Sequence, residues 1–430
     1  METKTYSNKK AYTFAISIVF FIVLSVYVGK IANYIALIVF LGSFFFLEKI
    51  DIYILLFAIF PFANIFKASA SSMSFLTICE IILFVFIFFD FLKNKLKFKS
   101  IFLFSILAFT IYLVVGFFEQ FSFSVFIKML IRPFILYYLF NSEFSYDKKK
   151  AVTVGIAYML SVSMILMMFL SLNQSFMERV IDYLRIVQIQ NGLQQLTRNG
   201  GLLTDPNYCS LAILMTLSLL GVLYYSKQVG SVYWLFIIPL IVMGFSTYSK
   251  SFFLCIIAYA VLMTMFVLFP KHPGWGVVTT AVVSVIAYGV VNGRIEVIEL
   301  VLDRFQNGDI TTGRSNLNRT YLTYLADNPS KLFFGSGITS YAIDTYNNVH
   351  NLFIESLYKL GIVGSFIYCI LIRSCMYANG RKKRLVAYFP VIFMVTMYMA
   401  LAGLDSFELI YYFIICGVST KYTGNEIEKS

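Results

Sequence analysis

Charged residues are scarce in this chain. Lysine, arginine, aspartate and glutamate make up 13% of its 430 residues, whereas hydrophobic residues make up 59%. A water-soluble domain of this length needs a much larger charged surface. The composition therefore excludes an ordinary soluble globular protein and indicates a chain that lies in a membrane.

Clusters of metal-ligating residues are also missing. There are only two histidines, and the six cysteines (79, 209, 255, 369, 375 and 416) show no CxxC or similar spacing. Neither a zinc site nor a disulfide framework is expected from such a pattern. The chain has no P-loop, no GxSxG and no HExxH motif, which argues against nucleotide hydrolysis, serine hydrolases and zinc proteases. We expect no metal and no other cofactor.

What the sequence does contain is a series of apolar runs of about 20 residues, the length of a helix that crosses a bilayer. The runs are continuously apolar, which disfavours a β-barrel. We predict an all-α polytopic integral membrane protein with about 12–14 transmembrane helices. The predicted spans are 11–29, 31–47, 52–66, 75–92, 101–118, 124–140, 151–170, 208–225, 231–246, 250–269, 275–291, 351–373, 385–403 and 406–419. The third, ninth and last are short enough to be re-entrant.

The net charge of +12 is concentrated in short connectors between spans. The lysine-rich segments 93–99, 147–150 and 381–384 all fall in the cytoplasm if the N-terminus is cytoplasmic, as the positive-inside rule requires. We therefore predict that both termini are cytoplasmic and that nucleic acid is not a partner. The predicted organisation is N-terminal transmembrane helices (1–170), an extracytoplasmic loop (171–207), central transmembrane helices (208–291), a second extracytoplasmic loop (292–350), and C-terminal transmembrane helices with a cytoplasmic tail (351–430).

The two predicted outer loops are rich in arginine, whereas lysine dominates the cytoplasmic connectors. Because a guanidinium binds phosphate or carboxylate in a bidentate way, these loops suit a lipid-linked phosphate or an acidic sugar. The alternative is contact with lipid headgroups or with neighbouring carboxylates. We favour that alternative for Arg179, Arg185 and Arg304, and ligand binding for Arg198 and Arg314. The remaining arginines of these loops are Arg294 and Arg319.

Each of the two favoured arginines has neighbours that suit a binding loop. In TRNGGLLTDPNYCSLAIL, two glycines after Arg198 let the backbone approach a ligand, and Asp205 and Asn207 read as a turn and cap before the next span. In TTGRSNLNRTYLTYLADNPSKLFFGSG, residues 315–329 are helix-like. Thr312 or Ser315 could cap a helix whose first turns carry Arg314 and Arg319, and Gly335 and Gly337 would shape the return loop.

Two further cations stand at or within predicted spans. Lys250, in FSTYSKSFFLC, lies at the outer mouth of a span, where it either snorkels to the surface or meets a diphosphate. Arg132 lies inside the sixth span and is followed by Pro133. A buried arginine needs a partner or a wet cavity, and the proline predicts a kink or two half-helices.

The stretch NNVHNLFIESLYKLGIVG places His350 where a predicted span begins on the outer side. The partial positive charge of a helix N-terminus keeps an imidazole neutral, so His350 could accept a proton from a hydroxyl group. The alternative is a histidine that caps the helix or faces lipid headgroups. Glu355 lies five positions later, about 140° round the helix, and so does not share its face. We expect Glu355 to pair with a cation from another helix.

Four stretches together resemble the O-antigen polymerase (Wzy-type) and O-antigen ligase superfamily of membrane glycosyltransferases. They are RNGGLLTDPNYCSLAIL (198–214), STYSKSF (246–252), TGRSNLNRTYLTYLADNPSKLFFGSG (312–337) and VHNLFIESLYKLGIVGSF (349–366), and they cover about the second half of the chain. The outer loops also have no DxD-like acidic pair for a metal-bound nucleotide sugar, which fits a lipid-borne donor.

The resemblance implies a C-type glycosyltransferase fold in a bacterial inner membrane. It implies an enzyme that moves glycan from an undecaprenyl-diphosphate carrier to a sugar hydroxyl on the outer face. His350 would be the general base, and the diphosphate would contact Arg198, Lys250, Arg314 and, as a fourth cation, Arg319. Supporting residues would be Arg132, Asp205, Asn207, Asn351 and Glu355. Lys250 replaces the arginine usual in the family, so the charge is kept there but bidentate binding is not.

The leading hypothesis is a repeat-unit polymerase that makes capsule, exopolysaccharide or O-antigen. Its partners would be the undecaprenyl-diphosphate-linked oligosaccharide and membrane lipids, with a chain-length regulator and a flippase as further candidates. The nearest alternative is the ligase, which passes the finished glycan to a terminal acceptor. A flippase or other transporter is the third, and it would be expected to carry more ionisable residues within its spans.

Overall fold

The computed structural model describes residues 8–65, 73–93, 96–116, 123–180, 199–203, 205–269, 314–338, 349–376, 385–401, 403–404, 406 and 408–422, and the isolated residues 274, 277, 281 and 284. Every regular element in these ranges is a helix. Five of these helices are long and apolar enough to cross a membrane: α1 (Lys9–Val28), α4 (Phe75–Leu92), α7 (Tyr146–Ser171), α9 (Pro206–Tyr225) and α17 (Leu352–Met376). The prediction of an all-α polytopic membrane protein is confirmed.

Shorter helices complete the described part of the bundle. Those that match predicted spans are α2 (Lys30–Phe46), α3 (Ile52–Ile59), α5 (Ser100–Gly116), α6 (Phe123–Asn141), α10 (Val232–Ser246), α11 (Lys250–Met263), α18 (Phe389–Tyr398) and α19 (Glu408–Tyr422). Most have ends close to those of the predicted spans, but α3 and α11 end earlier than predicted and α18 is shorter at both ends. The predicted span 275–291 lies outside the described residues apart from 277, 281 and 284. In the second predicted loop, α15 (Arg314–Asp327) and α16 (Pro329–Phe334) replace the single helix expected over 315–329.

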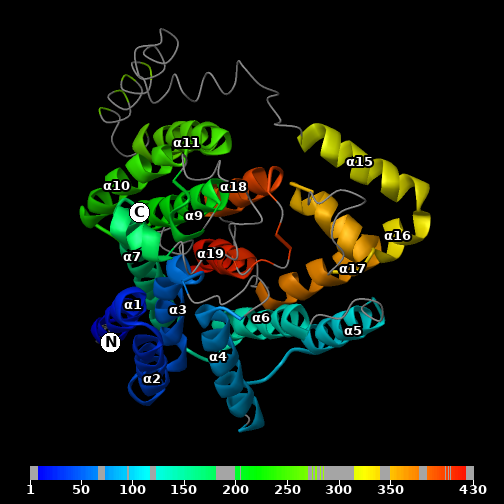
Figure 1. Cartoon of the computed structure of the whole chain (residues 1–430), viewed down its shortest axis with the longest axis horizontal. Coiled ribbons are helices and arrows are strands. Elements are labelled where there is room, and N and C mark those ends of the chain that lie inside the picture. The colour runs from blue at the N-terminus through cyan, green and yellow to red at the C-terminus, as the bar shows by residue number, and fades with distance from the viewer. Residues whose placement is uncertain are drawn as a thin grey trace.

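The middle of the bundle is formed by α9, α18 and α19, and the other helices surround them (Figure 1). Nearly every side chain of α9 is buried, including polar Ser210, Thr216 and Ser218, whose hydroxyls bond backbone carbonyls of their own helix. Large apolar side chains on α1, α2 and α5 point outward, for example Phe20, Phe45 and Phe104. Such an outer surface suits contact with lipid rather than water.

Two expectations for individual helices are wrong. Pro133 lies inside α6, which continues from Phe123 to Asn141, so this segment is not two half-helices. By contrast α17, predicted as a single span, is broken at Gly361, where φ is 65°. It consists of residues 352–360, called here the half-helix, and residues 362–376, which leave the bend in a different direction (Figure 1).

The bend in α17 results from a close backbone crossing with the end of α16. A Cβ atom on Gly361 would lie 2.5 Å from the nitrogen of Gly335, and a Cβ on Gly335 would lie 2.3 Å from the carbonyl oxygen of Lys359. The backbone nitrogens of Ser336 and Gly337 donate to the carbonyls of Tyr358 and Lys359 at 2.7 and 3.1 Å. Carbonyls freed by the broken helix are thus satisfied by the loop after α16.

Polar contacts divide the bundle into two ends. At one, called the Lys148 end, Lys148 reaches Asp51 at 2.8 Å, and Asn8 donates to the carbonyl of Ala151 at 2.7 Å. Two further side-chain amides donate hydrogen bonds to backbone carbonyls there, Gln228 to Tyr422 and Asn141 to Cys375. The other is called the His350 end. There the side chains of Asn64 and Asn351 donate hydrogen bonds to the carbonyls of Leu202 and Met399, and the hydroxyl of Ser249 donates to the side-chain oxygen of Asn207. Each group contains the helix ends that the predicted alternation of spans assigns to one side.

Candidate functional site

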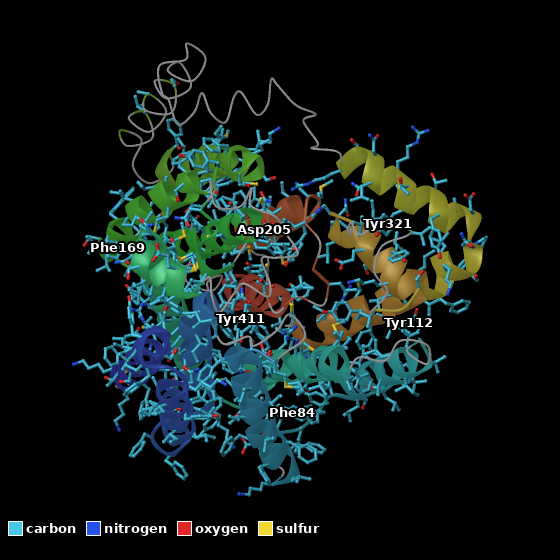
Figure 2. The ribbon with its side chains drawn as sticks, in the orientation of Figure 1. Phe84, Tyr112, Phe169, Asp205, Tyr321 and Tyr411 are labelled. Atoms are coloured by element: carbon cyan, nitrogen blue, oxygen red, sulfur yellow. The ribbon has the colours of Figure 1, made fainter. Side chains whose placement is uncertain are left out.

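The start of α9 lies at the centre of the His350 end (Asp205 in Figure 2). Asp205 caps this helix, because its carboxylate accepts the backbone N–H of Asn207 at 2.6 Å. Pro206 follows at the first helical position, where its missing N–H removes no hydrogen bond. The cap predicted for Asp205 is confirmed. The side chain of Asn207 does not cap the helix, because its oxygen accepts a hydrogen bond from the hydroxyl of Ser249 at 2.9 Å.

This hydrogen bond joins the start of α9 to the start of α11. Ser249 caps α11 by accepting the N–H of Phe252, and Lys250 is the first helical residue. The preceding turn is tight, because Tyr248 has a φ of 48° and Thr247 bonds Ser210 of α9 at 2.8 Å. Lys250 is therefore held, half-buried, at the end of the bundle where it was predicted.

The half-helix of α17 begins beside the same region. Asn351 caps it, since its side-chain oxygen accepts the N–H groups of Phe353 and Ile354 at 3.0 and 3.2 Å. The amide of Asn351 also donates to the carbonyl of Met399 at 3.1 Å. His350 directly precedes this cap and is not itself the capping residue. The alternative of a capping histidine is therefore wrong.

The surroundings of His350 lower the pKa of its imidazole below its usual value of 6.5. Partial desolvation contributes most, the positive charge of Arg314 adds to it, and the negative charge of Asp205 opposes it. The side chain remains exposed to solvent at the surface of the described structure. His350 is thus a neutral, accessible base near neutral pH, and it lies within electrostatic reach of Arg314 and Asp205.

Arg314 is half-buried and is the first residue of α15. A small hydrophobic cluster of Tyr321, Leu325, Val349 and Tyr358 fixes α15 against the half-helix. The rings of Tyr321 and Tyr358 meet edge to face at 4.9 Å (Tyr321 in Figure 2). This packing brings the N-terminus of α15 to the N-terminus of the half-helix. Arg319 lies further along α15 and is exposed.

Glu355 is buried and makes three contacts. One carboxylate oxygen accepts the backbone N–H groups of Gly403 and Leu404 at 2.6 and 3.0 Å, and the other lies 2.7 Å from the ammonium of Lys359. Lys359 is one turn later in the same half-helix. The expectation of a cation from another helix is therefore wrong, because the segment that precedes α19 packs against Glu355 with its backbone.

Arg132 has its main partner in a carboxylate of α4. Its Nε lies 3.3 Å from Glu80, and Nη1 donates to the carbonyl of Ser406 at 2.9 Å. Tyr411 donates to the other oxygen of Glu80 at 3.1 Å (Tyr411 in Figure 2). All three side chains are buried. Arg132 thus serves as part of an ion pair that also binds the backbone before α19.

The arrangement of the His350 end suits a bound anion. The N-termini of α9 and α11 meet through Asn207 and Ser249, and those of α15 and the half-helix meet near His350. Helix N-termini carry partial positive charge, and Lys250 and Arg314 add full charges there. Among the residues that the structure describes, no group of three or more His, Cys, Asp or Glu side chains is placed to hold a metal.

Several arginines of the predicted outer loops lie outside the residues that the structure describes. Arg198 is outside the described residues, as are Arg185, Arg294, Arg304 and His272. Arg179 lies in a helical stretch at residues 174–180, and its guanidinium carbon is 5.3 Å from the centre of the Tyr27 ring. Sequence reasoning missed Glu80 and Ser249. Glu80 carried the same signal as Arg132, an ionisable residue inside an apolar span.

Comparison with known proteins gives one match. Residues 234–369 match the family model described as O-antigen ligase. This range contains Lys250, Arg314, His350 and Glu355, and it ends within the second part of α17. No curated protein and no solved structure matches the chain.

Proposed function

We propose, from the membership of this chain in the O-antigen polymerase and ligase superfamily, that it is a polysaccharide repeat-unit polymerase. The family supports glycosyltransferase activity of the polymerase or ligase type. The finer proposal is transfer of a glycan from an undecaprenyl-diphosphate carrier to a sugar hydroxyl on the outer face of a bacterial inner membrane.

The observation that carries the proposal is the juxtaposition of a base with cations at one end of the bundle. His350 is affected electrostatically by Arg314 and Asp205, and its pKa is lowered. Asp205 is two residues from Asn207, which is joined to the start of α11 and so to Lys250. Acceptor activation and leaving-group stabilisation need such a pair of groups within one site.

The proposed reaction assigns a role to each part. The imidazole of His350 takes the proton of the acceptor hydroxyl, and the resulting oxygen attacks the anomeric carbon of the donor sugar. The bond from that carbon to the diphosphate oxygen breaks, and the diphosphate leaves on its lipid. Arg314, Lys250, Arg198 and the helix N-termini stabilise the charge that develops on it. Arg319, which is exposed, is a peripheral contact in this proposal.

The proposed sidedness follows from charge. Lys148 lies at the opposite end from His350. The alternation of spans along the sequence predicts that end for the lysine-rich segments 93–99, 147–150 and 381–384. The positive-inside rule then puts the Lys148 end in the cytoplasm. The His350 end faces outward, where lipid-linked repeat units would be delivered by a flippase.

A deletion strain complemented with His350→Ala or with the wild-type gene tests the proposal. A polymerase requires that the variant strain still exports and attaches single repeat units, seen as one short band instead of a ladder on a gel. The membrane level of the variant protein should match the wild type. Polymer of normal length in the His350→Ala strain would remove His350 from the reaction.

The ligase is the second candidate, because the matching family model carries that description. It predicts the opposite phenotype in the same strain. Long polymer would accumulate on the lipid carrier and none would reach the terminal acceptor. Extraction of lipid-linked glycans from the His350→Ala strain, followed by sizing, separates the two.

A further inference from the structure

The segment 399–406 connects two helices that are short for a membrane. α19 has 15 residues, about 22 Å of helix at 1.5 Å per residue, against about 30 Å of hydrocarbon. α18 has 10 residues and is extended by a four-residue 3₁₀ turn. The far end of α19 is held at the Lys148 end, where Lys421 donates to the carbonyl of Phe140 at 2.8 Å. The segment is therefore expected to lie below the membrane surface.

Non-helical backbone at such a depth requires hydrogen-bond partners from the protein. The described residues supply them from three places. Glu355 accepts the N–H groups of Gly403 and Leu404, Asn351 donates to the carbonyl of Met399, and Arg132 donates to the carbonyl of Ser406. Two buried charges of the spans thus act on the backbone of one segment.

The half-helix also depends on outside support. It is separated from the rest of α17 by Gly361, and helices this short are not stable on their own. Its far end is tied to the loop after α16, and the hydroxyl of Tyr112 lies within hydrogen-bond distance of the carbonyls of Phe334 and Leu360, which share its one proton (Tyr112 in Figure 2). Its near end, which carries His350, is tied to segment 399–406 through Asn351 and Glu355.

These contacts form one continuous path from the transmembrane bundle to His350. It runs from Glu80 of α4 to Arg132 of α6 and to the carbonyl of Ser406; three residues earlier in the same segment, Gly403 donates to Glu355 of the half-helix. Tyr411 of α19 fixes Glu80 from the other side.

We propose that Arg132 and Glu355 are positioning residues that hold segment 399–406 by its backbone, and that this segment fixes the half-helix so that His350 faces the start of α9 and of α15. The assignment of His350 as the base rests on the proposed function, whereas the mechanical link does not. Neither residue contacts substrate in this proposal.

The test uses the fact that the chain has only two histidines. In a His272→Asn background, His350 is the sole histidine of the full-length protein in lipid nanodiscs. The rate at which diethyl pyrocarbonate modifies His350 is measured by mass spectrometry between about pH 5 and 8, the range in which imidazole titrates. The midpoint of that profile reports the environment of the ring. Arg314 of α15 and Asp205 before α9, the charged groups that face His350, are kept in every variant.

Two independent variants interrupt the path. Glu355→Ala removes the acceptor for the two backbone N–H groups. Glu80→Gln combined with Arg132→Met removes the tie to Ser406 and leaves no unpaired buried charge. Both should raise the midpoint toward 6.5 and speed the modification, because the released half-helix moves the ring away from its partly desolvating surroundings and from the charge of Arg314. All three changes together should give no larger shift than the stronger of the two variants, since they break one path.

The matched control is a charge-neutral change at the other end, Asp51→Asn with Lys148→Met. That ion pair is buried to a similar degree, with side-chain exposures of 9% and 10% against 3% and 6% for Glu80 and Arg132. The control should leave the midpoint unchanged. An unchanged midpoint in Glu355→Ala and in the Glu80→Gln/Arg132→Met variant would overturn the proposal, as would an equal shift in the control.

A second arm measures glycan transfer in membranes that contain the native lipid-linked donor. Both path variants should lower the rate on the order of a hundredfold, the effect of misplacing a reacting group by about 1 Å, while the Asp51→Asn/Lys148→Met control keeps it. If the unmodified protein transfers no glycan, the proposed function fails, and the modification profile still decides the positioning proposal. A normal rate with a shifted midpoint would show that the link exists but that His350 is not the base.

Discussion

Both ends of the bundle hold buried charges, but the two ends use them differently. At the Lys148 end the charges pair with one another: Lys148 lies 2.8 Å from Asp51 and 3.2 Å from Glu48, and Lys49 pairs with Asp90. At the His350 end the carboxylates of Asp205 and Glu355 accept backbone N–H groups. The first end thus joins elements mainly through side-chain ion pairs, with Lys421 on the carbonyl of Phe140 as a backbone contact. At the second end the carboxylates mainly hold backbone N–H groups, and the ion pair of Glu355 with Lys359 stays within one helix.

The two ends should therefore affect different properties, the Lys148 end the stability of the fold and the His350 end the reaction. Side-chain ion pairs join the turn at residues 49–51 to α4 and to α7 and hold these helices in register at the Lys148 end. At the His350 end, caps and backbone ties place the N-termini of four helices, and the positive ends of their dipoles, in one region. A change at the first end should therefore alter unfolding, and a change at the second should alter the reaction.

The largest effect is expected from Lys148→Met. It leaves the carboxylate of Asp51 buried, and the pKa of Asp51 is already raised by desolvation despite its contact with Lys148. Loss of one partner of a buried ion pair destabilises a protein by about 3–5 kcal/mol. The midpoint of thermal unfolding in detergent should fall clearly. Adding Asp51→Asn should restore most of it, and a midpoint equal to the wild type in the single variant would contradict this account.

Arg314→Ala should have the next largest effect, and on the reaction alone. Loss of one group that stabilises a developing charge lowers a rate by about 10²–10³-fold, or about 2.7–4 kcal/mol. Because Arg314 is half-buried at a helix start, the unfolding midpoint should change little. Glycan transfer in membranes measures the rate. Arg319→Ala, on the exposed side of the same helix, is the control, and an equal loss there would show that the helix and not the charge matters.

Gly361→Ala should have an intermediate effect at the joint between the two ends. Its φ of 65° and the 2.5 Å approach to the nitrogen of Gly335 both oppose a side chain. Backbone strain of this kind costs about 1–3 kcal/mol. We expect a lower unfolding midpoint together with a reduced transfer rate. The control is Gly42→Ala in α2, where a Cβ meets nothing within 4 Å, and this change should leave both quantities intact.

The helices were predictable because each has a continuous apolar run and local end signals. The fourth predicted span has the same ends as α4, whose N-cap is Ser74. The bend in α17 was not predictable, because its cause is Gly335, which approaches from another helix. For Pro133 the local sequence left two alternatives, a kink or two half-helices, because it does not contain the packing that keeps α6 continuous.

The candidate site was predictable in its residue types and in the end of the bundle where they lie. Strict alternation of spans was enough to bring Lys250, Arg314 and His350 to one end. The contacts of Glu355 and Arg132 could not be predicted, because both act on the backbone of segment 399–406. No side-chain pattern in a sequence identifies a backbone group as the partner of a charge.

The smallest expected effect is a pair of opposite shifts in the pKa of His350. The positive charge of Arg314 lowers this pKa and the negative charge of Asp205 raises it. Arg314→Ala should therefore move the titration midpoint of His350 upward, and Asp205→Asn should move it downward. NMR of the imidazole in a His272→Asn background measures both without an activity assay.

In the wild type the pKa of His350 lies below its usual value of 6.5, so the imidazole stays neutral to a lower pH. The transfer rate should therefore fall on the acid side with a midpoint below 6.5. Shifts of the same sign in the two variants would mean that they act through a change of structure, and the electrostatic link between the starts of α9, α15 and α17 would then have to be abandoned.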